Sequence, residues 1–253
     1  MNNTLRDVLS KLFFQVNYTC NACEKEIFTG KYFCDDCEKT LPKIKKDRCD
    51  HCGRITNYAV NYCNSCVEWN INFDKARSAF DYVEPINAFI KAFKYDGKKY
   101  LAEVFADKLK SIYVSEFLTS DVIVSVPMTA ERLKERGYNH AELLASELSN
   151  LINVPYDASV IKKTRETPRQ ANLTKLERRN NLKKSFTVYK SSVENKHVLL
   201  VDDVLTTGAT ADILASALKK KGALTVTVLT VASVQSSALK VKFEDETENI
   251  KES

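Results

Sequence analysis

Eight cysteines in four C-x-x-C pairs occupy the N-terminal part of this 253-residue chain, and no cysteine occurs elsewhere. The pairs are Cys20/Cys23, Cys34/Cys37, Cys49/Cys52 and Cys63/Cys66. Each cysteine of the first half recurs 29 residues later, so "CNACEKEIFTGKYFCDDC" is duplicated as "CDHCGRITNYAVNYCNSC". Segments this short need a cross-link or a metal ion to fold, because their hydrophobic core is too small.

Zinc explains this spacing, because a C-x-x-C turn presents two thiolates to one ion and two turns complete a tetrahedral site. A disulfide framework fits poorly with an N-terminus that lacks a secretory signal pattern. Four copies in a repeat also favour a structural role over a redox role. We expect two closed structural Zn²⁺ sites, one per repeat, although a cross-braced pairing of the first and third turns is also compatible with the spacing. The aromatic residues between the turns are expected to form small cores, with stacking on nucleic-acid bases as the alternative; they are Phe28, Tyr32, Phe33, Tyr58 and Tyr62.

The rest of the chain alternates between strand and helix patterns. Short apolar, β-branched runs predict strands, and stretches with helical apolar spacing predict helices between them. The predicted strands are 76–83, 121–127, 156–163, 185–189, 197–204 and 224–233. This alternation predicts an α/β fold with a parallel sheet flanked by helices. We expect a zinc-binding module over residues 1–70, the α/β domain over 71–234, and a disordered acidic tail over 235–253.

The net charge of +5 is unevenly distributed. Residues 161–190 contain ten Lys or Arg and only two acids, Glu166 and Glu177, which gives a local excess of +8. Such an excess indicates either an anionic partner or simply a solvated surface. The sequence has no apolar run of about 18 residues, so no membrane span is predicted, and we expect a cytoplasmic protein.

The stretch "VLLVDDVLTTGATADIL", from Val198 to Leu214, ends a predicted strand in two acids and then enters a helix. Ligands of open α/β sheets bind beyond the carboxyl ends of the strands. The loop offers backbone N–H groups at a helix N-terminus, which is a phosphate-binding arrangement; its residues are Thr206, Thr207, Gly208, Ala209 and Thr210. Asp202 and Asp203 would repel a phosphate, so a sugar diol is the natural partner for them.

This stretch resembles the 5-phosphoribosyl-1-pyrophosphate (PRPP) motif of type I phosphoribosyltransferases, which Val198 to Thr210 match at every position. The resemblance implies a type I phosphoribosyltransferase-like parallel sheet. It also implies a PRPP-binding site to which Mg²⁺ comes with the substrate, and transfer of a phosphoribosyl group with release of pyrophosphate if the protein is an enzyme.

More of the chain, about residues 18–232, resembles the ComF family of competence-associated proteins. The resemblance includes the cysteine module, "FKYDGKKYLAEVFADKL", "VPMTAERLKERGYNHAELLA" and "RETPRQANLTKLERRNNLKKSF". His140 departs from the expected pattern, in which Gln follows "GYN". The resemblance implies that Pro127 and Arg136 belong to a pyrophosphate-binding loop, with Arg132 and Lys134 as further candidates. It also implies that residues 165–181 form a lid in which Arg165, Arg169 and Arg178 stabilise the leaving pyrophosphate, while Gln170 and Asn181 contact the substrate or hold the lid.

The family implies a role in DNA uptake, with contact to single-stranded DNA and, as partners, a competence helicase and recombination mediators. Two alternatives remain open on sequence alone. One is a metabolic or salvage phosphoribosyltransferase with an unidentified acceptor. The other is a non-catalytic DNA-binding adaptor whose PRPP pocket serves only as a sensor or as a site for a DNA 5′-phosphate. We predict that Asp202 and Asp203, with Arg165 and Arg178, carry the chemistry of the site.

Overall fold

The structure is a computed structural model that describes residues 19–27, 32–44, 47–164, 185–189 and 193–234. The chain forms two compact units, residues 1–42 and 43–253. The smaller unit contains the first cysteine repeat and the short helix α2 (Asp35–Thr40). The larger unit contains the second cysteine repeat and everything after it, including helix α3 (Asn64–Trp69).

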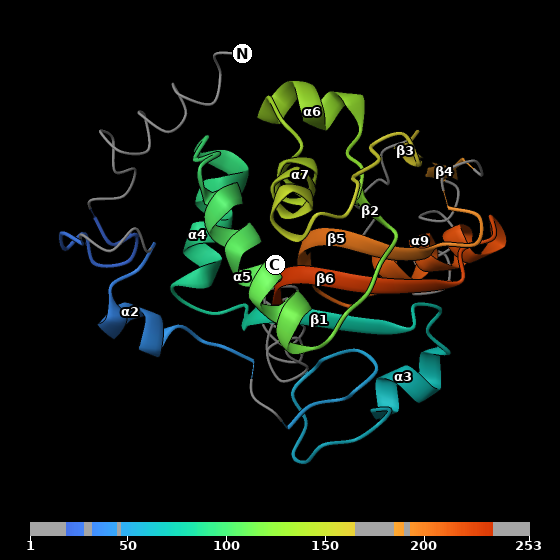
Figure 1. Cartoon of the computed structure of the whole chain (residues 1–253), viewed down its shortest axis with the longest axis horizontal. Coiled ribbons are helices and arrows are strands. Elements are labelled where there is room, and N and C mark those ends of the chain that lie inside the picture. Colours follow the sequence, from blue (N-terminus) through green and yellow to red (C-terminus); the bar gives the residue numbers. More distant parts are fainter. Residues whose placement is uncertain (1–18, 28–31, 45–46, 165–184, 190–192, 235–253) are drawn as a thin grey trace, which may run out of the picture. The chain divides into compact units, whose positions relative to one another are not determined.

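A four-stranded parallel sheet with the order β1-β6-β5-β2 forms the centre of the larger unit (Figure 1). Its strands are β1 (Lys75–Asp81), β2 (Val122–Ser125), β5 (His197–Leu205) and β6 (Thr225–Ser233). The two central strands are buried along most of their length, as expected for strands covered on both faces. A separate antiparallel pair joins β3 (Ile161–Lys163) to β4 (Phe186–Val188). The predicted parallel α/β sheet is therefore confirmed.

Helices cover both faces of this sheet. The chain forms α4 (Ile86–Tyr95), α5 (Leu101–Ser115), α6 (Ala130–Arg136), α7 (His140–Ile152) and α9 (Ala209–Lys220). Helices α5 and α7 contact each other and the sheet. A cluster of buried side chains includes Leu214 of α9, Leu200 of β5 and Val228 of β6. The same cluster includes Cys49, Cys52 and Cys66, so the second cysteine repeat shares a core with the sheet.

Local sequence signals explain the ends of several helices. Asn139 caps α7 by accepting a hydrogen bond from the N–H of Ala141 at 3.1 Å, as its position after "GY" predicts. Thr129 caps α6 in the same way through the N–H of Arg132. Gly222 follows the end of α9 with φ of +95°, the left-handed conformation that glycine favours after a helix. The caps at Thr129 and Asn139 fix the starts of α6 and α7, and Gly222 follows the end of α9.

Candidate functional site

Each cysteine repeat brings its own four sulfur atoms together. The ligand atoms of Cys20, Cys23, Cys34 and Cys37 lie within 4.8 Å of one another, and those of Cys49, Cys52, Cys63 and Cys66 do the same. In the second cluster the Sγ–Sγ distances are 3.9 Å for Cys49–Cys66 and 3.7 Å for both Cys52–Cys63 and Cys63–Cys66. A tetrahedral ion with Zn–S bonds of about 2.3 Å requires sulfur atoms about 3.8 Å apart.

The cysteines thus fit two Zn²⁺ ions, one per repeat, and the cross-braced pairing is wrong. All eight described cysteines are free of disulfide bonds. In each cluster one cysteine has a lowered pKa, which favours its thiolate form. Hydrogen bonding from Cys66 lowers the pKa of Cys52 to about 5, against the opposing effect of burial. In the first cluster burial raises the pKa of Cys20, but hydrogen bonds from backbone N–H groups lower it to about 6. Thiolates are the form that binds zinc.

The aromatic residues of the repeats divide into two groups. Phe33 is buried, as expected for a small core, whereas Tyr58 and Tyr62 are 70% and 60% exposed. The prediction that these two tyrosines form a core is wrong, because the second repeat buries its inner side against the sheet and leaves them on its outer side. Tyr32 is half-buried, and Phe28 lies outside the described residues.

A small pocket lies where β5 leads into α9. Its lining includes Asp202, Thr206, Gly208 and Thr210, with Val126 from the end of β2 and Thr230 from β6. Ala209, the first residue of α9, is held by a hydrogen bond from its N–H to the Thr207 hydroxyl at 3.3 Å. No protein acceptor for the N–H groups of Thr207 and Gly208 occurs among the described residues. The loop thus presents donors and hydroxyls at the positive end of a helix.

The two adjacent acids lie in different surroundings. Both belong to β5, which continues to Leu205, and successive side chains of a strand point to opposite faces. Asp202 is partly exposed and lines the pocket. Asp203 is buried at 4% exposure. The two carboxylates therefore differ in burial, although one oxygen of each lies within 4.8 Å of the other and of a ring nitrogen of His140.

Asp203 is part of a buried ionic cluster. Its Oδ2 lies 2.9 Å from Nζ of Lys94 in α4 and 2.7 Å from Nε2 of His140 in α7. Burial raises the pKa of Asp203, but the contacts with His140 and Lys94 outweigh it and lower the pKa to about 2. Burial would lower the pKa of Lys94, but Asp203 raises it. Asp203 is therefore a carboxylate held between α4 and α7. Sequence reasoning missed Lys94, and it noted His140 only as a departure from the family pattern.

Asp202 titrates in the opposite direction. Burial and the neighbouring charge of Asp203 raise its pKa to about 8. A cation or a set of hydroxyl donors in the pocket would favour the charged form of Asp202. Lys94 and His140 contact Asp203, whereas Asp202 is the carboxylate of the pair that lines the pocket.

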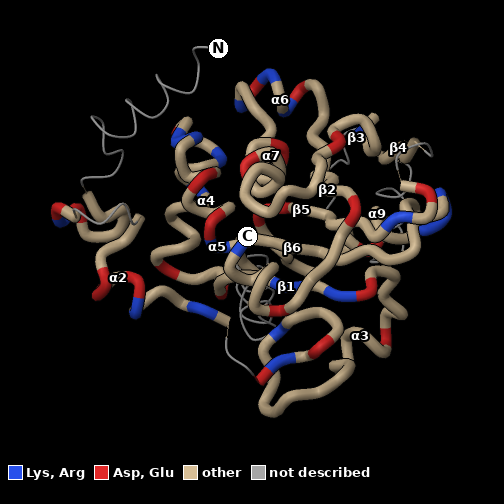
Figure 2. The backbone as a smooth tube through the Cα atoms, in the orientation of Figure 1, with Lys and Arg blue, Asp and Glu red and all other residues tan. Residues whose placement is uncertain are grey.

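The loop between β2 and α7 carries the predicted pyrophosphate-binding residues. Pro127 lies just past the end of β2, next to the pocket residue Val126. Arg136 ends α6, where its Nη2 donates to the Tyr95 hydroxyl at 3.1 Å and its guanidinium lies 4.7 Å from the centre of that ring. Basic and acidic residues are interspersed on α6 (Figure 2). Arg136 is therefore held by α4, and Lys134 is exposed.

The predicted lid lies outside the described residues. This applies to Arg165 and Arg178, to Arg169, Gln170 and Asn181, and to most of the basic stretch 161–190. Their predicted roles stay predictions, as does the predicted acidic tail.

Comparison with known proteins places these features in a family. The model for the phosphoribosyl transferase domain matches residues 103–251, and the double zinc ribbon domain matches residues 10–67. The chain belongs to the phosphoribosyl transferase domain family. It is 30% identical to "Competence protein ComFC" of Bacillus subtilis, covering 72% of this chain and 75% of that protein. It is 29% identical to "Competence protein F" of Haemophilus influenzae, covering 81% and 86%.

A third relative, "DNA utilization protein YhgH" of Salmonella typhi, is 30% identical over 71% of this chain and 81% of its own. The chain is thus a ComF family member with a phosphoribosyltransferase-like fold and an N-terminal double zinc ribbon. No described helix of this ComF family member is both long enough and apolar enough to cross a bilayer.

Proposed function

We propose that this ComF family protein binds PRPP or a related sugar phosphate in the pocket between β5 and α9, and that it acts in DNA uptake in the cytoplasm. The observation that carries the proposal is the joint placement of Asp202 with Thr206, Gly208 and Thr210 around one pocket. The amides and hydroxyls of the loop suit a 5′-phosphate, and the Asp202 side chain suits the hydroxyls of a ribose.

Two parts of the site have separate tasks in this proposal. Asp202 binds the sugar diol, and Asp203 stabilises the pocket from behind by tying β5 to α4 and α7 through Lys94 and His140. A Mg²⁺ ion bound together with the pyrophosphate would neutralise phosphate charge, and it would need few protein ligands because this ion usually keeps several waters. Asp202 is the carboxylate available to it. The predicted roles of Pro127, Arg136, Arg165 and Arg178 at the pyrophosphate belong to the same proposal.

The role in DNA uptake follows from the relatives, which are named for competence and DNA utilization. Single-stranded DNA is the polymer we propose as a partner, bound through the basic stretch 161–190. A competence helicase and recombination mediators are the proposed protein partners. The second cysteine repeat is a poor candidate for the DNA-binding surface. Residues 47–69 contain two arginines against three acids, a net charge of 2 − 3 = −1.

Titration calorimetry with PRPP and Mg²⁺ tests the sugar-phosphate site. Wild type is expected to bind, and Asp202→Asn is expected to lose about tenfold or more in affinity, because an amide accepts hydroxyl donors less well than a carboxylate. Asp107→Asn is a matched control on the surface, where Asp107 contacts only the adjacent Lys108 among the ion pairs of the described residues. Equal affinities for wild type and Asp202→Asn would rule out the proposed role of Asp202.

The DNA-binding part is tested separately by measuring affinity for single-stranded DNA at increasing salt. Backbone contacts predict a linear fall of log K with log salt concentration. Asp202→Asn is expected to leave this affinity unchanged. Binding that is independent of salt would contradict the electrostatic model.

A non-catalytic sensor is a second candidate, favoured by the observation that Asp203 is already paired with Lys94 and in contact with His140. Measurement of pyrophosphate release from PRPP, with and without single-stranded DNA, separates the two candidates. Release that exceeds the background supports a transferase. Tight binding without release supports the sensor.

A further inference from the structure

The second cysteine repeat reaches the sugar-phosphate loop through one buried side chain. Nη2 of Arg54 donates a hydrogen bond to the backbone carbonyl of Thr206 at 2.9 Å. Arg54 is only 9% exposed, and it follows the zinc-binding Cys52 after a single residue. A buried guanidinium that contacts a loop carbonyl 152 residues further along the chain fixes the position of that loop.

This contact also orients the amide that faces the ligand. The C=O and N–H groups of a planar trans peptide point in opposite directions. When Arg54 holds the Thr206 carbonyl on one side, the N–H of Thr207 is turned to the other side. Thr207 N–H is one of the loop donors without a protein acceptor among the described residues. Arg54 thus sets the direction of a candidate phosphate-binding amide.

Two more contacts support the same loop. His51, between Cys49 and Cys52, stacks on Phe73 with ring centres 5.3 Å apart, and a Cβ at Gly208 would lie 3.9 Å from the Phe73 ring. The backbone N–H and side-chain amide of Asn72 both donate to Oδ1 of Asp212, in the first turn of α9, at 2.7 Å. The segment between the second cysteine repeat and β1 therefore contacts the first turn of α9.

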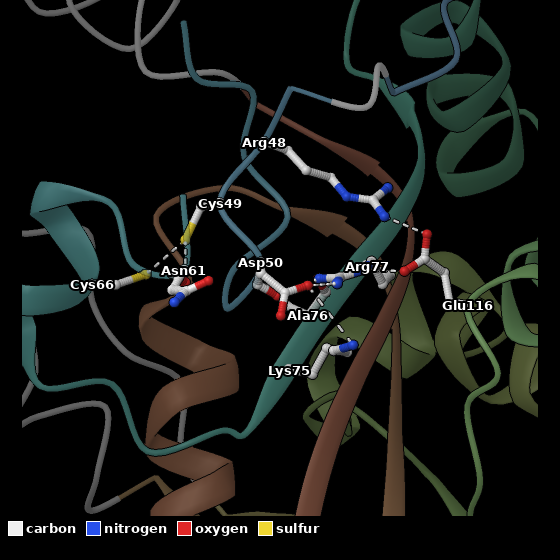
Figure 3. A network of polar contacts seen from close by, with 9 residues as sticks. All are labelled: Arg48, Cys49, Asp50, Asn61, Cys66, Lys75, Ala76, Arg77 and Glu116. Atoms are coloured by element: carbon white, nitrogen blue, oxygen red, sulfur yellow. Dashed lines mark hydrogen bonds and ion pairs between the residues drawn. The ribbon is translucent and has the colours of Figure 1, made fainter. Parts of the chain in front are cut away.

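The repeat itself is anchored to the sheet by ion pairs (Figure 3). Arg77 of β1, at 1% exposure, donates to Asp50 at 2.5 Å and to Glu116 at 2.8 Å. Arg48 contacts the other oxygen of Glu116. The backbone N–H of Ala76 also donates to the His51 carbonyl at 2.7 Å. These contacts hold the second repeat, and with it the backbone of Arg54, in a fixed position relative to the sheet.

We propose that the second zinc ribbon is a positioning element for the sugar-phosphate loop and that Arg54 is its positioning residue. Metal binding at Cys49, Cys52, Cys63 and Cys66 fixes the turn that carries Arg54, and Arg54 fixes the Thr206–Thr207 peptide. The effect on ligand affinity rests on the function proposed above, whereas the effect on the loop does not.

The first repeat supplies a matched control. Arg54 corresponds to Lys25, 29 residues earlier, and Lys25 is exposed in the smaller unit. We expect Arg54→Ala to weaken binding of ribose 5-phosphate by about tenfold or more, the effect of losing one hydrogen bond from a charged donor. Lys25→Ala should bind within twofold of wild type. Arg54→Lys, which keeps a charged donor without the planar fork, should fall between wild type and Arg54→Ala.

Hydrogen exchange of the full chain without ligand provides the second readout. Arg54→Ala is expected to speed exchange of the amides in 206–211 while leaving those of β5 and β6 unchanged, with zinc content still at two ions per chain. Zinc removal by a chelator should also speed exchange at 206–211 in wild type, together with a wider loss of protection because the second site lies in the core. Unchanged exchange at 206–211 in Arg54→Ala would overturn the inference.

The outcomes separate this inference from the proposed function. If wild type binds ribose 5-phosphate and Arg54→Ala binds equally well, the positioning role is wrong and the sugar-phosphate site stands. If wild type does not bind, the proposed function fails, and the exchange measurement still decides whether Arg54 holds the loop. A variant that loses zinc or unfolds as a whole would contradict a local positioning role, unless Arg54→Lys restores both the fold and the slow exchange.

Discussion

The two cysteine repeats have the same ligand spacing but different surroundings. In the first, Cys23 is exposed and Cys34 and Cys37 are half-buried, within a small unit of residues 1–42. In the second, three of the four cysteines are buried and belong to the core cluster that includes β5, β6 and α9. Duplication thus preserved the metal site, while packing gave only the second copy a place in the larger domain.

Equivalent positions in the two turns show the difference directly. Glu24 and Gly53 both have positive φ, +61° and +72°. Glu24 is exposed, so a side chain is accommodated there. A Cβ at Gly53 would lie 2.7 Å from the carbonyl oxygen of Ala76, on the adjacent strand β1. Glycine is therefore required by the close approach of two backbones in the second repeat, and the first repeat has no such requirement at Glu24.

The largest expected effect comes from removing one ligand in each repeat. Cys52→Ser should lower the free energy of unfolding of the larger unit by several kcal/mol, because structural zinc supplies on the order of 10 kcal/mol and this site lies in the core. Cys23→Ser should leave the unfolding of the larger unit nearly unchanged. Denaturant unfolding followed by circular dichroism, with zinc content measured alongside, checks this. Equal losses for both variants would contradict the difference between the repeats.

An exchange of residues between the two turns is the next test. Gly53→Glu should destabilise the larger unit by about 3 kcal/mol, since strained φ and overpacking each cost about 1–3 kcal/mol. The reverse change, Glu24→Gly, should cost little in its own unit because it removes an exposed side chain at positive φ. Thermal unfolding of the two variants gives the comparison. A tolerated Gly53→Glu would show that the second turn is not packed against β1.

The ion pairs that anchor the second repeat predict a pH dependence. Burial raises the pKa of Glu116, but Arg77 and Arg48 outweigh it and lower the pKa below its usual value. A depressed carboxyl pKa stabilises the fold above the unfolded pKa of about 4.3. That stability is lost as pH falls through the folded pKa.

Glu116→Gln should therefore cost about 2 kcal/mol at neutral pH, and the difference from wild type should shrink below about pH 4. Urea unfolding at a series of pH values measures it. Glu26→Gln in the first repeat, where Glu26 is exposed, is the control and should stay within about 0.5 kcal/mol. A cost for Glu116→Gln that persists unchanged at low pH would argue against the ion pairs as its source.

The smallest expected effect concerns partial zinc removal. A mild chelator should take the ion from the first cluster before the second, because Cys23 is exposed and Cys49, Cys52 and Cys66 are buried. Loss of the first ion alone should change the unfolding free energy of the larger unit by less than about 0.5 kcal/mol. Zinc release followed by a colorimetric indicator should show two phases. Release of zinc from the second cluster before the first, detected by labelling of the thiols of the second cluster, would contradict the expected order of zinc loss.

The sequence by itself determined the features whose signals are local. C-x-x-C spacing identified the zinc ligands, apolar runs identified the strands of the parallel sheet, and the threonine-rich loop after Asp203 indicated an anion-binding turn. The predictions of the zinc ligands and of the sheet are confirmed, because turn chemistry and backbone periodicity are encoded within a few residues. Anion binding by the loop stays a prediction. The family comparison and the confirmed parallel sheet agree with them.

Only the tertiary structure decided which partners the long polar side chains have. Asp203 contacts Lys94 and His140, and Arg54 contacts Thr206, although the residues of each contact are far apart in the sequence. Burial then distinguishes Asp202, which is partly exposed and lines the pocket, from the buried Asp203, although their carboxylates lie within 4.8 Å of each other. The physical reason is that a buried charge takes whichever opposite charge or carbonyl the packing of remote elements brings within reach, and no local pattern specifies that packing.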